Sequence, residues 1–219
     1  MKIPQTIFTI PHFKSLSFLW AKHTLSEGWD LSLSHVASAV TKSKTENTLY
    51  FRQTNGLYST YKSGDLNLSG NIYFQFAKNQ TGKKVSAVLV DAEAKYKLCK
   101  LTTGIGLSYL SGNNKTCTDQ EPDHLFDILY GARHRFFGGI DYFRSFDSHT
   151  KQGGLTDYYF FLHYKFSKKT SLKNTSHFFQ LAQTNPFTPE DENDLVLKHQ
   201  LQVGERWKVV ICSPCQPAF

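Results

Sequence analysis

The sequence alternates apolar and polar side chains in roughly ten stretches, most of them about 10–14 residues long. A period of two is typical of a β-strand, whose successive side chains point to opposite faces of a sheet. The expected strands are residues 15–25, 29–40, 49–62, 66–78, 85–98, 100–111, 133–144, 155–166, 170–183 and 194–203. Globular strands have about 5 or 6 residues, whereas a tilted strand that crosses a bilayer needs about 9–11. The strand lengths therefore favour a membrane-crossing sheet.

Short and long connections alternate over most of the chain. The short ones, rich in turn-forming Gly, Ser and Asp, are 26–28, 63–65, the junction near Cys99, 167–169 and 204–206. The long ones are 41–48, 79–84, 112–132, 145–154 and 184–193. Bacterial membrane barrels have short periplasmic turns and long outer loops. We therefore predict an all-β, antiparallel, up-and-down transmembrane β-barrel of about ten to eleven strands, forming one domain over residues 1–219.

The polarity of the strands separates two faces. In 155–166 the outward set is Tyr158, Phe160, Leu162, Tyr164 and Phe166, and the opposite set is Asp157, Tyr159, Phe161, His163 and Lys165. The same division occurs in 66–76 and 85–98. A soluble β-sandwich produces this division too, with its apolar face inside. Strand length and loop alternation, rather than polarity, distinguish the barrel.

Composition agrees with this interpretation. The chain is 40% hydrophobic with a mean hydropathy of −0.40 and contains no apolar run of about 18 residues, so transmembrane helices are excluded. A barrel strand exposes only every second residue to lipid, and its average composition stays polar. Aromatic residues make up 15% of the chain, with 18 Phe and 11 Tyr, and rings of this kind form the interfacial girdles of barrels. Strands in general also favour aromatic residues.

Three segments carry a resemblance to a known family: FDILYGARHRFFGGIDYF, GLTDYYFFLHYKF and SLKNTSHFFQLA. They resemble the alginate-export family of outer-membrane β-barrels, in particular its Bacteroidetes-type members. The earlier segments QTNGLYSTYKSGDLNLSGNIYFQFAK, SAVLVDAEAKYK and GIGLSYLSGNN fit the same pattern. The likeness covers about residues 15–203, and its most specific part is 130–143.

This resemblance implies a bacterial outer-membrane channel through which an anionic polysaccharide, or another anionic solute, diffuses along a basic lumen. Its partners would be outer-membrane lipid, including lipopolysaccharide, and the barrel-assembly machinery. The net charge of +7 and the pI of about 9.1 agree with a basic lumen. If the strand phases hold, the inward bases are Arg52, Lys62, Lys95, Lys97, Arg133, Arg135, Lys165, Lys173 and Lys198, with His163 and His177. The acids on the same face are Asp91, Glu93, Asp141 and Asp157.

These charges have two further interpretations. Acids and bases inside any barrel can cross-link neighbouring strands and fill the lumen, and a positive excess can bind lipopolysaccharide phosphates. Nucleic acid is not favoured as a partner, because Lys and Arg are spread over every strand and no recognition motif is found.

The chain offers no convincing catalytic motif. Its nine His residues are scattered, and none falls in a paired metal spacing. Cys212 and Cys215 form one Cys-x-x-Cys pair, but a zinc site needs a second. Cys99 in a turn and Cys117 in a loop should lie at opposite membrane edges, too far apart to bridge. We predict no enzyme activity, no metal and no cofactor.

The two ends depart from the barrel pattern. Residues 1–11 have no export signal, and the pattern continues through 207–211 before a tail with two prolines, within an atypical segment 204–219. We expect a C-terminal part of a larger barrel: an open curved sheet if partial, and a narrow or plugged barrel if complete.

Two alternatives stay open. One is a closed narrow barrel acting as an adhesin or surface enzyme, with acid and His side chains converging among Asp119, Glu121, Asp123, His124 and Asp127. The other is a soluble antiparallel β-sandwich or barrel that binds a ligand, in which a second sheet would cover the apolar face.

Overall fold

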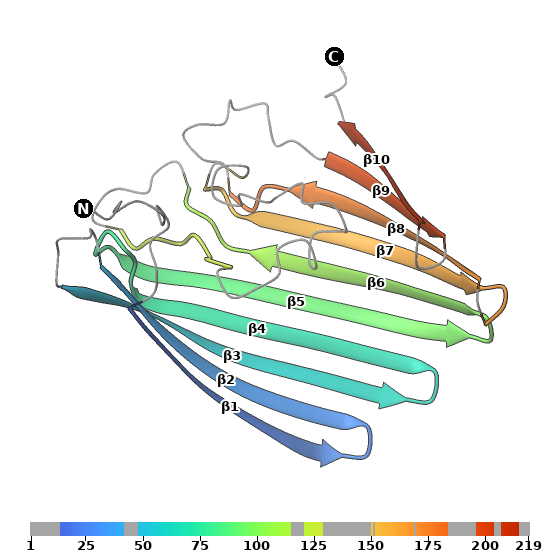
Figure 1. Ribbon diagram of the computed structural model, residues 1–219, viewed down its shortest axis with the longest axis horizontal. Helices are drawn as coiled ribbons and strands as arrows, with labels where there is room; N and C mark the ends of the chain where they lie inside the picture. Colours follow the sequence, from blue (N-terminus) through green and yellow to red (C-terminus); the bar gives the residue numbers. More distant parts are fainter. Residues whose placement is uncertain are drawn as a thin grey trace, which may run out of the picture.

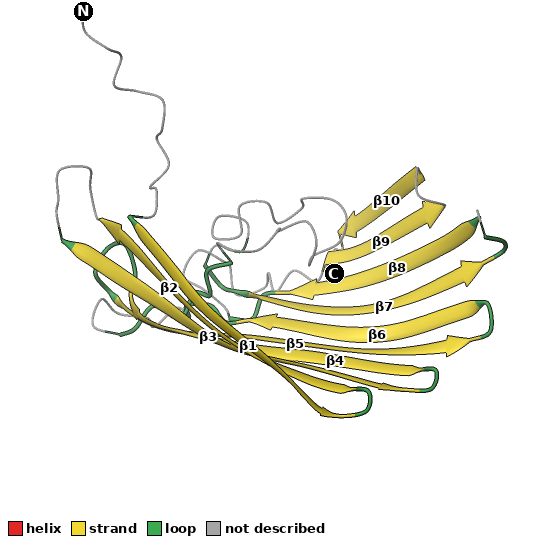
Figure 2. Cartoon of the chain, turned by 60° about the horizontal axis from the view of Figure 1, so that its bottom comes forward, coloured by secondary structure: helices red, strands yellow, loops and turns green. Residues whose placement is uncertain are grey.

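The structure, a computed structural model, describes residues 14–41, 48–114, 121–128, 150, 152–168, 170–183, 196–203 and 207–214. These residues form one ten-stranded sheet in which each strand pairs antiparallel with its neighbour in sequence. Figures 1 and 2 show that the sheet is twisted and curved, with β1 and β10 at its two edges. The all-β, up-and-down antiparallel architecture is therefore confirmed, and among the described residues the sheet is open. No helix in the described part of the chain is long and apolar enough to cross a membrane.

The strands match the sequence pattern closely. They are β1 (Ser15–Ser26), β2 (Trp29–Thr41), β3 (Leu49–Ser63), β4 (Leu66–Lys78), β5 (Lys84–Leu98), β6 (Leu101–Leu110), β7 (Leu155–Lys165), β8 (Ser171–Gln180), β9 (Val196–Val203) and β10 (Trp207–Pro214). Each bound of β1 to β5 lies within one residue of the predicted bound. Alternation locates these strands well because each has one apolar and one polar face.

The strand predicted at 133–144 has no place in the sheet between its expected neighbours. β6 pairs directly with β7, from Leu101 opposite Tyr164 to Leu110 opposite Leu155. A strand between them would have separated β6 from β7 and made the two parallel. The expected sheet order is therefore wrong at this point, and residues 133–144 themselves lie outside the described residues.

The C-terminal segment also differs from its expected form. β10 continues to Pro214, which lies opposite Val196 of β9. A proline cannot donate a backbone hydrogen bond, but an edge strand has one side on which no bond is needed. The proline was therefore compatible with a strand at this position.

Tight turns lie at one end of the sheet, as predicted. Gly28, in the β1–β2 turn, has a φ of 77°, a conformation that side chains other than glycine rarely adopt. An added Cβ would overlap the Lys62 carbonyl oxygen. The Lys62 backbone N–H donates to the Gly28 carbonyl at 2.8 Å, which holds this turn against the end of β3. We call this end of the sheet the turn end and the opposite end the loop end.

A small hydrophobic core lies on one face of the sheet, at its loop end. Its buried members are Val85, Ala87, Leu110, Phe126, Leu155 and Phe179. All but Phe126 come from β5 to β8, and their positions in the register put them on the same face. We call this face, which is the concave one in Figure 2, the inner face, and the opposite face the outer face. Side chains that project from a concave surface point toward one another, so large side chains become buried there.

Candidate functional site

Charge is almost confined to the inner face. Residues directly opposite each other in antiparallel strands share a face, so the register sorts the side chains. In β1 to β8 the inner face carries Lys22, Asp30, Arg52, Lys62, Asp91, Glu93, Lys95, Lys97, Asp157, Lys165 and Lys173. The outer face of the same strands carries only Lys78 and Lys84, which lie opposite each other at the loop end.

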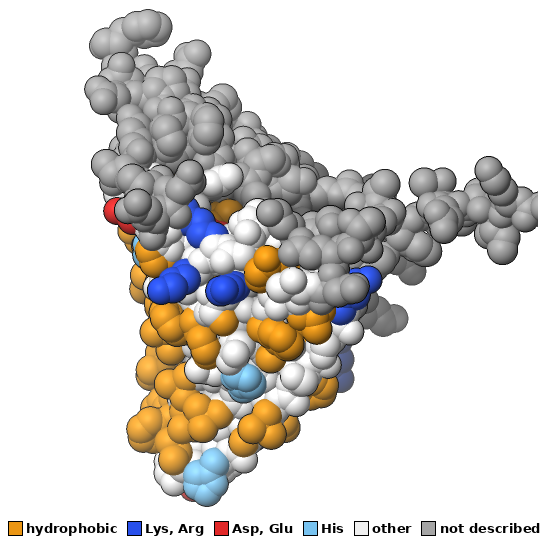
Figure 3. All heavy atoms as spheres, turned by 90° about the vertical axis from the view of Figure 1, so that its left-hand side faces the viewer, with side chains coloured by type: hydrophobic (Ala, Val, Ile, Leu, Met, Phe, Trp, Pro, Cys, Tyr) orange, Lys and Arg blue, Asp and Glu red, His pale blue; other side chains and the backbone are white. Residues whose placement is uncertain are grey.

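The outer face is apolar and open. Its exposed large side chains include Leu33, Leu57, Leu68, Ile72, Phe74, Ile105, Tyr158, Phe160 and Leu162. Further rings, those of Trp29, Tyr61, Tyr96 and Tyr164, lie on this face toward the turn end. In Figure 3 hydrophobic side chains gather along one outline of the molecule. In β7 the outward and inward sets of side chains are those predicted.

Bases gather at the turn end of the inner face. Lys97, Thr102, His163 and Lys173 are consecutive partners across β5 to β8. Lys62, Lys95 and Lys165 lie in the adjacent rows, and we call the six bases Lys62, Lys95, Lys97, His163, Lys165 and Lys173 the basic band. In the described strands no Asp or Glu occupies an inner-face position in these rows.

The band keeps much of its positive charge. Lys95 pairs with Glu93, two residues along the same strand, and the Lys173 ammonium lies 5.0 Å from the centre of the Phe161 ring. Lys97 and Lys165 form no ion pair within the described residues and are exposed. The nearest inner-face acid on the same strand is Glu93, four positions from Lys97, which is about 13 Å along the strand. This distance exceeds the screening length of about 8 Å in physiological salt.

Acids occupy the middle of the inner face and are held mainly by neutral donors. Asp91 accepts hydrogen bonds from the Ser108 hydroxyl at 2.9 Å and the Asn71 amide at 3.4 Å. Glu93 accepts one from the Tyr159 hydroxyl at 3.2 Å. Lys97 and Lys165 of the basic band stay exposed to solvent ions. Asp91 and Glu93 therefore link β4 to β7 through neutral hydrogen-bond donors, whereas the cross-linking interpretation expected pairs of acids and bases.

A buried His–Asp pair lies beside the acids Asp91 and Glu93. His177 Nδ1 is 2.9 Å from an Asp157 carboxylate oxygen, and the Asp157 side chain is completely buried. The His177 ring stacks on Phe179, with centroids 5.5 Å apart, and lies 5.4 Å from the Tyr159 ring. A pair packed between two rings acts as a structural link between β7 and β8.

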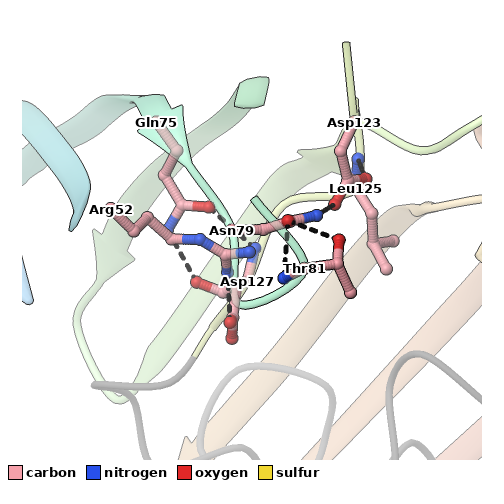
Figure 4. Close-up of polar contacts among 7 residues, drawn as sticks. All are labelled: Arg52, Gln75, Asn79, Thr81, Asp123, Leu125 and Asp127. Carbon is pink, nitrogen blue, oxygen red and sulfur yellow. Dashed lines mark hydrogen bonds and ion pairs between the residues drawn. The ribbon is translucent and has the colours of Figure 1, made fainter. Parts of the chain in front are cut away.

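The segment 121–128 lies against the loop end of the inner face. The Gln75 side chain, which is fully buried, donates to the Asp127 carbonyl at 2.8 Å and accepts from the Asp127 N–H at 2.9 Å. Arg52 forms an ion pair with the Asp127 carboxylate. Figure 4 shows the side chains of Gln75 and Arg52 reaching Asp127. Phe126 inserts into the hydrophobic core. Sequence alone could not decide where the long connection 112–132 lies, and part of it lines the inner face.

The start of this segment extends the sheet beside β5. Asp123 donates its N–H to the Lys84 carbonyl at 2.7 Å and accepts from the Ser86 N–H at 2.9 Å. It thus occupies the side of β5 that β6 leaves unpaired beyond Leu110. The Asp123 carboxylate accepts from Asn79 at 2.9 Å, an interaction also visible in Figure 4. These contacts fix the segment before it crosses the inner face.

The proposed enzyme cluster does not converge in the described residues. Asp123, His124 and Asp127 each contact a different residue of the sheet or its loops. Asp123 contacts Asn79, Asp127 contacts Arg52, and His124 Nδ1 lies 2.7 Å from the Ser86 carbonyl oxygen. Glu121 is exposed, and Asp119 lies outside the described residues. The described residues contain no group of three or more His, Cys, Asp or Glu side chains that could hold a metal ion.

The predicted path residues fall into three groups. On the inner face lie Arg52, Lys95, Asp157, His163, Lys165, Lys173 and His177. Arg52, however, is engaged by Asp127, and His177 and Asp157 engage each other. Lys198 of β9 is the register partner of His177. Arg133, Arg135 and Asp141 lie outside the described residues.

The sequence was compared with protein-family models and with curated proteins, and neither comparison found a match. The alginate-export resemblance therefore stays a prediction.

Proposed function

We propose that this chain forms the wall of an outer-membrane channel of the alginate-export type, which passes anionic polysaccharide or other anions along its inner face. The observation that carries the proposal is the segregation of charge: an apolar outer face suits lipid, and a concave inner face with a basic band suits water and anions. A soluble protein would have to cover the exposed rings of a convex face.

The lengths of the strands support a membrane span. β3 and β5 have 15 residues each, more than the roughly 9–11 needed by a tilted strand. The outer-face rings at the turn end are of the kind that forms an interfacial girdle. For example, the Trp29 ring packs edge-on against the Tyr61 ring, with their centroids 6.4 Å apart. In a membrane both sheet edges must be paired. β1 and β10 run antiparallel, so they could pair with each other or with further strands.

The basic band sets the expected selectivity. Exposed ammonium groups near one mouth of a pore lower the free energy of an entering carboxylate or chloride ion and raise that of a cation. The acids farther along the face limit how tightly an anion is held, which keeps passage reversible. We therefore expect weak, multi-site anion preference.

The test is a reversal-potential measurement in planar bilayers under a potassium chloride gradient. The double variant Lys97→Gln/Lys165→Gln should lose much of the anion preference of the unmodified protein. The control Lys78→Gln/Lys84→Gln removes the same charge from the outer face and should retain that preference. A cation-preferring channel, or one that responds equally to both variants, would contradict the proposal.

A further inference from the structure

A recess between β1 and β4 on the inner face is not explained by anion passage. Its volume is about 320 Å³, near the lower end of ligand pockets, which begin at about 300 Å³. Its aromatic members are Trp20, Tyr58 and Tyr73. Two hollows on the outer face are larger, at about 610 and 550 Å³, but their linings are mostly aliphatic and aromatic, which suits lipid chains.

The register explains how the recess forms. Trp20, Ser34, Gly56 and Tyr73 are consecutive partners across β1 to β4. Ser34 is small and leaves a low floor beside Trp20. The Tyr73 ring packs over Gly56, where an added Cβ would overlap it. The next row contains Tyr58, whose side chain is 40% exposed, while that of Trp20 is 60% exposed. Two rings therefore offer open surface to a ligand.

The polar side of the recess is rich in hydroxyl groups. Ser32, Ser34 and Thr60 line it, and each hydroxyl can both donate and accept a hydrogen bond. At the turn-end side, Lys22 and Asp30 form an ion pair of 2.8 Å and remain partly exposed. Thr24 also donates to Asp30 at 2.7 Å. The paired charges cancel, so this recess does not select by net charge as the basic band does.

We propose that this recess binds one pyranose ring of a saccharide, by stacking and hydroxyl hydrogen bonds rather than by charge. A pyranose has a face of C–H groups that packs on an aromatic ring and a rim of hydroxyls that both donate and accept. Aromatic side chains with nearby polar groups provide both kinds of contact. The inference rests on the proposed function only in requiring that the inner face meets solvent. It adds that neutral and acidic sugars bind alike.

The test uses tryptophan fluorescence of the full chain in detergent micelles. The probes are an oligouronate, the same oligosaccharide with its carboxyl groups reduced, and sodium sulfate. Both oligosaccharides should shift the emission saturably, and sulfate should neither shift it nor compete. The shift should disappear in Trp20→Phe and persist in Trp29→Phe, because Trp29 lies on the outer face.

A second pair of variants measures affinity. Tyr58→Leu should weaken both oligosaccharides by roughly two- to tenfold. Tyr61→Leu, which removes a similarly exposed ring from the outer face of the same strand, should not. The proposal that the recess binds a saccharide would be contradicted by any of three results. These are a shift that survives Trp20→Phe, an absence of saturable binding, and binding that sulfate abolishes. Chloride conductance of the same preparation tests the channel separately. Conduction without sugar binding contradicts only the proposal of a saccharide site. Sugar binding without conduction supports the saccharide site and contradicts the proposed channel.

Discussion

Replacing Gln75 with leucine tests whether segment 121–128 is fixed to the inner face. Leucine has nearly the size of glutamine but cannot form the two hydrogen bonds to the Asp127 backbone, which measure 2.8 and 2.9 Å. A buried backbone group left unpaired costs about 1–3 kcal/mol. The two groups together therefore favour detachment of the segment by at least about 2 kcal/mol, from the lower bound for each. The burial of Phe126, which stabilises the docked segment by about 1.5–3 kcal/mol, opposes complete detachment. The expected result is therefore more frequent local opening of the segment rather than its permanent release.

Hydrogen-exchange mass spectrometry measures this opening directly. About 2 kcal/mol corresponds to roughly 30-fold faster exchange of the amides in 121–128, while amides in β2 should be unchanged. Asn67→Leu is the matched control, because Asn67 lies on the inner face of the same strand at the turn end. The reasoning would be refuted if exchange in 121–128 stayed the same in Gln75→Leu, or if Asn67→Leu accelerated it equally.

Two further substitutions test the packing of the inner face, each by guanidinium unfolding of the refolded protein. Gly106→Val should destabilise the sheet by about 1–3 kcal/mol, because a Cβ at Gly106 would overlap the Tyr159 ring. The equivalent change at outer-face Gly70, whose nearest neighbour is 3.5 Å away, should have little effect, and equal losses would contradict this explanation. His177→Phe removes the hydrogen bond to buried Asp157 and should cost about 1.5–3 kcal/mol; unchanged stability would show that the pair contributes nothing.

The alternation of side chains was enough to locate most strands, because it is a local property of the sequence. It also gave the correct faces: the register places Lys97 and His163 on one face, as their strand phases implied. That they also lie in one row follows only from the register. The strand predicted at 133–144 shows the limit of this signal. Alternation indicates that a segment can pair, but not with which partner, and the direct pairing of β6 with β7 depends on contacts distant in sequence.

The position of segment 121–128 could not be predicted from its sequence. It is short and polar apart from a few residues, so it has no period that indicates a buried face. Its anchor is Gln75, an ordinary polar position of a strand, which bonds to backbone groups rather than to a particular side chain. Arg52 was placed correctly on the inner face, but its ion pair with Asp127 makes it part of the wall.

The recess between β1 and β4 was missed for a related reason. Trp20 and Tyr58 lie 38 residues apart in sequence, and only the register brings them to adjacent rows. In the sequence Leu16, Phe18 and Trp20 alternate regularly with Ser15 and Ser17, so Trp20 alone gives no signal of a site. The register places this apolar set on the inner face, which alternation within one strand could not show.

The central claim is that the outer face meets lipid and the inner face meets water. The most direct measurement is the collision accessibility of spin labels placed singly along β7, in a cysteine-free chain reconstituted into lipid vesicles. Labels at Tyr158 and Leu162 should be reached mainly by oxygen, which partitions into lipid, and labels at His163 and Lys165 mainly by a water-soluble nickel chelate. Accessibility that alternates in this way along the strand is the predicted result. Equal access of the nickel chelate to all four positions would contradict the account.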